Sequence, residues 1–153
     1  MRGKLSSAAE NQSSYIPFHF IMTPELALAI TATIDEGSSL LIKIGKKVNE
    51  ARKFRRKCTL VNADAKLLLK LLEKNQEAID GLETLNAFKQ CLADIGSFVA
   101  SCASWSKVDV GLEVFVRHRF PALREKTRAL IEKFTFEVEV SLLYCKSTIL
   151  AFC

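Results

Sequence analysis

The sequence predicts an all-α protein: an up-and-down four-helix bundle with a short extra helix or irregular link before the last long helix. Three observations predict this fold class. Only three prolines and six glycines occur in 153 residues, so long stretches are free of helix-breaking residues. Apolar residues recur at spacings of three and four along four separate segments. An apolar fraction of 49% and a charged fraction of 25% are typical of a globular chain that buries a core as one domain.

The first helix is predicted over 24–49. Thr23 supplies a capping hydroxyl, Pro24 suits the first helical position, and Glu25 lies near the positive end of the helix dipole. The stripe weakens around Gly37, where we expect a kink. Its apolar positions alternate between spacings of three and four and are Ile30, Ile34, Gly37, Leu41, Ile44, Val48 and Ala51.

The second and third helices are predicted over 52–75 and 82–102, joined by the polar segment 75–81. Both carry apolar stripes with a seven-residue period. The stripe of the second helix consists of Phe54, Cys58, Val61, Ala65, Leu68 and Leu72, with Leu60, Leu67 and Leu71 expected to widen the buried face. The stripe of the third helix consists of Leu85, Phe88, Leu92, Ile95, Val99 and Cys102.

The last part of the chain is less regular. Residues 103–119 are predicted as a link with a short helix near 110–116, and Phe120-Pro121 is expected to start the fourth helix. Residues 135–140 alternate like a strand, but a lone strand without a partner is not stable, so we predict helix there. The inward positions of the fourth helix are expected to be Leu123, Leu130, Ile131, Phe134, Val138, Leu142 and Cys145.

The domain organisation follows from these elements. Residues 1–22 are predicted to be a flexible or docked N-terminal tail, residues 24–148 the bundle, and residues 149–153 a C-terminal tail.

A basic run interrupts the otherwise balanced charge of the chain. Eight basic residues fall within fifteen positions and are opposed there only by Glu50. Residues 1–57 carry a net charge of +5, and the rest of the chain is neutral. Such a run suits an anionic membrane surface, where each basic side chain contributes about 1 kcal/mol, or it forms the solvated end of a core-facing helix. The candidate lipid-headgroup-binding residues are Lys43, Lys46, Lys47, Arg52, Lys53, Arg55, Arg56 and Lys57.

An apolar stretch of the first helix precedes this run. Joined to the cationic segment, it predicts a helix that inserts into lipid, although the same side chains would serve equally well in the core of the bundle. The candidate membrane-inserting residues are Leu26, Leu28, Ile30, Ile34, Leu40, Leu41 and Ile44.

Other classes of function find little support. Only Phe54 could stack on a base among the basic residues, which argues against nucleic acid as the partner. The only histidines are His19 and His118, and no phosphate loop, nucleophile motif or metal-ligand spacing appears, so we expect no enzyme, cofactor or metal site.

The cysteines and the hydropathy indicate where the protein acts. The sequence has five cysteines, an odd number without paired spacing, and three of them lie on predicted apolar stripes: Cys58, Cys102 and Cys145. This pattern indicates free thiols in a reducing compartment, and hence the cytoplasm. No apolar stretch reaches the roughly 20 residues of a spanning helix, and residues 1–14 lack the apolar centre of a secretory signal.

Three stretches resemble the HeLo and HeLo-like domain superfamily. This group includes fungal cell-death executors, the N-terminal bundle of the mixed lineage kinase domain-like pseudokinase, and bundles at the front of plant resistance proteins. The stretches are Phe54-Arg55-Arg56-Lys57-Cys58-Thr59-Leu60, Leu85-Asn86-Ala87-Phe88-Lys89-Gln90-Cys91-Leu92 and Val114-Phe115-Val116-Arg117-His118-Arg119-Phe120. The resemblance spans about residues 24–146. The 22 residues before the first helix and the sparse glycines depart from the pattern of the fungal members.

The resemblance implies a domain of regulated cell death and innate immunity. Such a domain is cytoplasmic at rest, forms homo-oligomers on activation, binds anionic lipids of the plasma membrane or another cell membrane, and permeabilises it. It also implies a regulatory kinase-like or nucleotide-binding receptor module as a partner. The alternative is a non-lytic adaptor or signalling bundle that binds another protein.

Overall fold

A computed structural model describes residues 23–104 and 110–152, and the predicted tail 1–22 lies outside this part of the chain. The predicted all-α bundle is confirmed. Two short 3₁₀ helices, η2 (Arg52–Phe54) and η3 (Gln76–Ala78), lie between longer helices. The four long helices are α2 (Pro24–Glu50), α3 (Arg55–Lys74), α4 (Leu82–Ser104) and α5 (Val110–Phe152).

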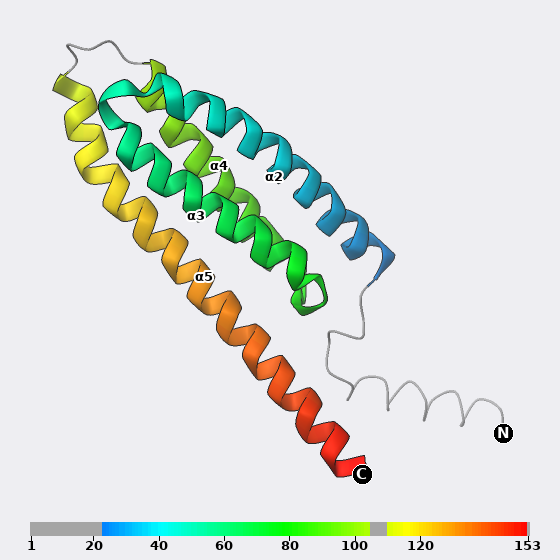
Figure 1. Cartoon of the computed structure of the whole chain (residues 1–153). Coiled ribbons are helices and arrows are strands. Elements are labelled where there is room, and N and C mark those ends of the chain that lie inside the picture. Colours follow the sequence, from blue (N-terminus) through cyan, green and yellow to red (C-terminus); the bar gives the residue numbers. More distant parts are fainter. Residues whose placement is uncertain (1–22, 105–109, 153) are drawn as a thin grey trace.

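The helices α3 and α4 form the centre of the molecule (Figure 1). Helix α2 packs against both of them from one side, and α5 packs against both from the other. The turn from α2 to α3 and the turn from α3 to α4 lie at opposite ends of the bundle, so α3 runs from one end to the other.

Helix α2 is capped as predicted and is tightly packed. The Leu26 amide donates to Thr23 Oγ1 at 3.2 Å. Gly37 does not interrupt the helix; it allows a close approach, because a Cβ there would lie 2.8 Å from Leu69 Cδ1 and 3.3 Å from Leu92 Cδ1. The buried residues of α2 extend along the whole helix and are Leu26, Ile30, Thr33, Gly37, Ile44 and Val48.

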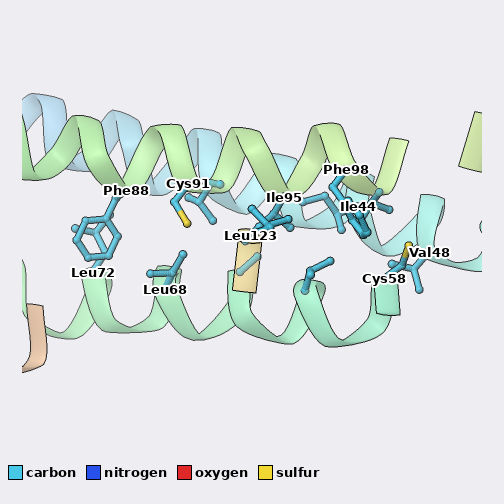
Figure 2. Close-up of a cluster of buried hydrophobic side chains, with 14 of the residues drawn as sticks. Ile44, Val48, Cys58, Leu68, Leu72, Phe88, Cys91, Ile95, Phe98 and Leu123 are labelled. Atoms are coloured by element: carbon cyan, nitrogen blue, oxygen red, sulfur yellow. The ribbon is translucent and has the colours of Figure 1, made fainter. Parts of the chain in front are cut away.

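The core lies between the facing stripes of α3 and α4. Figure 2 shows Phe88 of α4 next to Leu72 of α3 at one end of this core and Cys58 next to Val48 at the other. Every predicted stripe position of the third helix is buried. The two predicted heptad stripes therefore meet each other, as in other helical bundles.

Of the three leucines expected to widen the buried face of α3, Leu71 is partly buried against the core as predicted, but the face is widened mainly on the other flank. Leu60 and Leu67 are exposed, and Asn62 and Leu69 are buried in their place. Leu69 contacts the Gly37 backbone of α2, so the flank that carries Asn62 and Leu69 is the one that α2 covers. Heptad spacing identified the centre of the face but not the side on which a third helix packs.

The predicted break before the last helix is wrong. Residues 110–152 form one helix of 43 residues with Pro121 inside it, not a short helix followed by a new start at Phe120-Pro121. Proline in a helix interior costs about 3 kcal/mol. Burial on both sides of Pro121 offsets this cost, since one face of α5 stays on the bundle through Leu112, Val116, Leu123, Thr127 and Phe134.

Polar and aromatic contacts attach α5 to the bundle. Arg124 donates two hydrogen bonds to the Asp64 carboxylate of α3, at 3.0 and 3.3 Å. Phe134 meets Phe88 edge to face, with ring centroids 5.0 Å apart.

The distal part of α5 also differs from the prediction. The helix continues to Phe152, so residues 149–152, expected in a C-terminal tail, are helical. The strand-like segment 135–140 is helical, as predicted. Leu142 was expected to point inward but is exposed, because α5 extends there past the end of α3 and α4 (Figure 1). The side chain of Cys145 lies outside the described part.

Candidate anion-binding surface

The fold gathers the predicted basic run at one end of the bundle. The C-terminus of α2, the short η2 helix and the first turn of α3 meet there, beside the start of α5 (Figure 1). Seven of the eight basic side chains are exposed and Lys57 is half-buried. We call this surface the basic end; it consists of Lys43, Lys46, Lys47, Arg52, Lys53, Arg55, Arg56 and Lys57.

The start of α3 has an unusual electrostatic arrangement. Its first turn carries Arg55, Arg56 and Lys57 and no acidic residue, and no side chain caps it. Because the helix dipole places positive charge at an N-terminus, each basic residue there is unfavourable by about 0.3–1 kcal/mol. The positive potential is therefore concentrated at this point.

Within the described residues, one acid from a distant part of the chain forms an ion pair with the basic end. Lys53 of η2 forms an ion pair with Glu113 in the first turn of α5. The hydrogen bond and the charge of Lys53, aided by the charge of Arg117, lower the pKa of Glu113. The pair is about half exposed, so its contribution to stability is small.

Three other basic side chains also have partners, two of them nearby in the sequence and one on α5. Arg55 Nη2 donates to the Asn49 carbonyl oxygen at 3.1 Å. Lys47 Nζ lies 3.4 Å from Glu50 Oε2 on the same helix. Lys57 Nζ lies 5.2 Å from the centroid of the Phe120 ring of α5, within the range of a cation–π contact.

The remaining half of the basic end is available to a ligand. In residues 23–104 and 110–152, four of its side chains make no ion pair, no cation–π contact and no side-chain hydrogen bond: Lys43, Lys46, Arg52 and Arg56.

Apolar side chains are exposed beside these charges. An open depression in the surface is lined by Arg52, Lys53, Arg55, Arg56, Thr59 and Leu60. Val110 and Val114 flank Glu113 at the start of α5 and are exposed, as is Ile42 of α2. The basic end thus combines unpaired cationic groups with apolar groups that can enter a membrane interface.

The predicted membrane-inserting residues are mostly part of the resting core. Leu26, Ile30 and Ile44 are buried, and Leu28 is exposed. The other three, which are partly buried and packed against the core, are Ile34, Leu40 and Leu41.

Cysteines near this end serve packing. Cys58 and Cys102, both predicted on apolar stripes, are buried, and Cys91 is buried as well. The neighbouring Cys102 thiol and burial raise the pKa of the Cys58 thiol. Cys91 Sγ lies 3.2 Å from Thr127 Oγ1.

Sequence reasoning found the eight basic residues but missed Glu113 and Phe120, which neutralise or cover two of them. No sequence signal identifies these partners, because Lys53 and Glu113 are 60 positions apart and meet only in the fold.

Comparisons with models of protein families, with curated proteins and with solved structures give no match. Within the described ranges, no helix is both long and apolar enough to cross a bilayer. The described side chains also include no group of three or more His, Cys, Asp or Glu residues placed to hold a metal ion.

Proposed function

We propose that this protein is a membrane-targeting helical bundle that binds anionic lipid surfaces through its basic end. The observation that supports this proposal most strongly is the start of α3. Three basic residues without a cap or an acid occupy the positive end of a helix, beside Arg52 and exposed valines of α5. This arrangement is unfavourable for the isolated protein, and an anionic surface relieves it.

The expected affinity for a membrane is modest and sensitive to salt. At about 1 kcal/mol for each basic residue near the headgroups, the four unpaired side chains contribute about 4 kcal/mol. Burial of a valine side chain in the interface adds up to about 1.5 kcal/mol. Because charges are screened beyond about 8 Å at physiological ionic strength, moderate salt should release the protein.

The resemblance to the HeLo-like superfamily extends the proposal to regulated cell death. The protein would be cytoplasmic at rest, move to the plasma membrane or another cell membrane on activation, and permeabilise it as a homo-oligomer through α2. A kinase-like or nucleotide-binding receptor module would regulate it.

Insertion of α2 has an energetic requirement. Leu26, Ile30, Ile44 and Val48 would leave the core, and each contributes about 1.5–3 kcal/mol by burial. The sum, about 6–12 kcal/mol, is as large as the whole stability of a typical domain. Insertion of α2 therefore follows lipid contact, in which acyl chains replace the lost protein neighbours, and does not precede it.

The experiment uses vesicles of a zwitterionic lipid with and without 30% anionic lipid. Co-sedimentation measures binding and the release of an entrapped dye measures permeabilisation, each at low and at moderate salt. We expect binding and leakage only with anionic vesicles, and both should weaken as salt rises. Equal inertness toward both vesicle types at low salt would refute the proposal.

A second candidate function is a non-lytic interaction module. The tight packing of α2 and the exposed apolar side chains of distal α5, such as Phe136 and Leu143, favour it. This candidate predicts that charge reversal at Arg55, Arg56 and Lys57 leaves activity intact, while substitutions on a bundle surface abolish partner binding. Vesicle binding without leakage would also favour it.

A further inference from the structure

The distal part of α5 extends beyond the rest of the bundle. Helix α5 has 43 residues and is about 65 Å long, whereas α3 has 20 residues and is about 30 Å long. Phe134 is buried and Val138 is packed against the core, and Figure 1 shows the helix continuing past the α3–α4 turn from there. Residues 139–152 therefore extend for nearly four turns beyond α3 and α4.

The outward face of this helix is largely apolar, although it also carries the exposed Ser147. Phe136, Val140, Leu143 and Leu150 are exposed by 66%, 47%, 63% and 75%. At 100° per residue they lie on the side of α5 opposite Phe134, facing away from the bundle. We call these four residues the outward stripe.

The same face is polar where α5 runs along the bundle. His118, Glu125 and Glu132 occupy equivalent angular positions and are exposed. The change from charged to apolar side chains at Phe136 coincides with the point at which α5 leaves the bundle. Solvation alone favours polar residues on both parts of this face, so the outward stripe indicates contact with a partner.

The charges beside the outward stripe indicate which partner fits. In heptad terms Phe136, Leu143 and Leu150 occupy d positions and Val140 an a position, which places Glu139 and Lys146 at successive g positions. Both are exposed. In an antiparallel pair of helices, g positions face g positions, so Glu139 of each chain would face Lys146 of the other. A parallel pair would not bring these two charges together.

We propose that the outward stripe binds a second copy of this chain, with the two α5 helices antiparallel and a two-fold axis near Leu142 and Leu143. The stripe and its charges are complementary to themselves only in this orientation. Because the stripe faces away from the bundle, the two α5 helices meet without their bundles colliding. The dimer does not depend on the proposed lipid binding. A protein that dimerises but does not bind vesicles would still support the dimer.

The arrangement has a geometric consequence. About 33 residues of α5 separate the basic end from the two-fold axis, so the two basic ends of the dimer lie about 100 Å apart. Because the two helices are antiparallel, the two basic ends lie at opposite tips of the dimer.

The first experiment measures the mass of the full chain by sedimentation equilibrium in a reducing buffer, from 1 to about 500 µM. We expect a dimer for the wild type and a monomer for Leu143→Glu at tens of micromolar. The control Leu28→Glu changes an exposed leucine of α2 and should leave the dimer intact. Circular dichroism should show unchanged helix content in both variants, because neither side chain is in the core.

Two outcomes would overturn the proposal. One is a wild-type monomer at every concentration, as expected if residues 15–22 or another protein covers the stripe. The other is a dimer that Leu143→Glu leaves unchanged, which would place the interface elsewhere.

The second experiment tests the orientation. Glu139→Lys and Lys146→Glu each place like charges opposite one another at two sites, and each should weaken dimerisation about tenfold. The double variant restores opposite charges in an antiparallel pair and should return to within about threefold of the wild-type affinity. A double variant as weak as the single variants would overturn the antiparallel arrangement.

Discussion

The two ends of the bundle are built from the same helices but are charged oppositely. At the far end, α4 starts with Glu83 in its first turn, and Thr84 donates to the Asp80 carboxylate at 2.9 Å. Acidic side chains at that position suit the positive end of a helix dipole. At the basic end, α3 starts with Arg55 and Arg56 and has no such support. Folding explains the first arrangement but not the second, and this difference supports the proposal that the basic end binds an anion.

The strongest test of this difference is charge reversal at the basic end. Replacement of Arg52, Arg55 and Arg56 by glutamate removes three cations and adds three repulsive charges. At about 1 kcal/mol per charge near the headgroups, binding to anionic vesicles should fall at least 100-fold. Co-sedimentation with vesicles of 30% anionic lipid measures the change.

A matched control lies on the same helix near the far end. Lys66, Lys70 and Lys74 are exposed, and their replacement by glutamate changes the net charge by the same amount. Binding should then fall less than about fivefold. An equal loss in both triple variants would mean that net charge, not the basic end, determines binding.

Helix α2 runs between the two ends of the bundle, and we expect it to be tightly packed along its length. Gly37→Ala places a Cβ 2.8 Å from Leu69 Cδ1, so the leucine must shift. Overpacking costs about 1–3 kcal/mol and alanine's helix preference returns about 1 kcal/mol, so unfolding free energy should fall by up to about 2 kcal/mol. Gly45→Ala meets nothing within 4 Å and should raise it by up to about 1 kcal/mol, because alanine favours the helix. Urea unfolding measures both. A Gly37→Ala variant as stable as Gly45→Ala would show that α2 is loosely held.

A smaller effect is expected from Glu113, which among the described residues is the acid that pairs with the basic run from another helix. Glu113→Gln releases Lys53 from its ion pair and adds one net positive charge at the basic end. Binding to anionic vesicles should become about two- to fivefold tighter. Glu83→Gln makes the same charge change at the far end and should alter binding less than twofold. Equal effects of the two variants would contradict a localised site.

The smallest effect concerns stability and has the opposite sign to the effect on binding. Arg56 makes no ion pair within the described residues, and Arg56→Glu places an acid at the positive end of α3. Unfolding free energy should rise by about 0.3–1 kcal/mol, which corresponds to roughly 1–4 °C in melting temperature. Scanning calorimetry checks this, and a lower melting temperature would show that Arg56 supports the fold.

The sequence predicts the regular features of this molecule well. Thr23 and Pro24 mark the start of α2, and the stripe from Leu85 to Cys102 is buried in full, because capping and helical periodicity are local properties. The continuity of α5 through Pro121 was not predictable in this way. It depends on burial against α3 and α4, which outweighs the local preference of proline.

In the candidate site, too, the features set by the local sequence were predicted and those set by the tertiary fold were not. The basic residues lie within fifteen positions of the sequence, so their grouping was predicted. Two contacts could not be predicted from the sequence, because they depend on the position of α5. They are the ion pair of Lys53 with Glu113 and the cation–π contact of Lys57 with Phe120. The exposure of the outward stripe likewise depends on how far α5 extends beyond the ends of α3 and α4.

The most direct test of the proposed anion-binding end is amide hydrogen exchange of the full chain with and without anionic vesicles, read by mass spectrometry. Peptides covering 49–57 should become protected when vesicles are added, while peptides covering 76–84 at the far end should not change, and salt should remove the difference. Equal protection at both ends, or none at either, would contradict the assignment of lipid binding to the basic end.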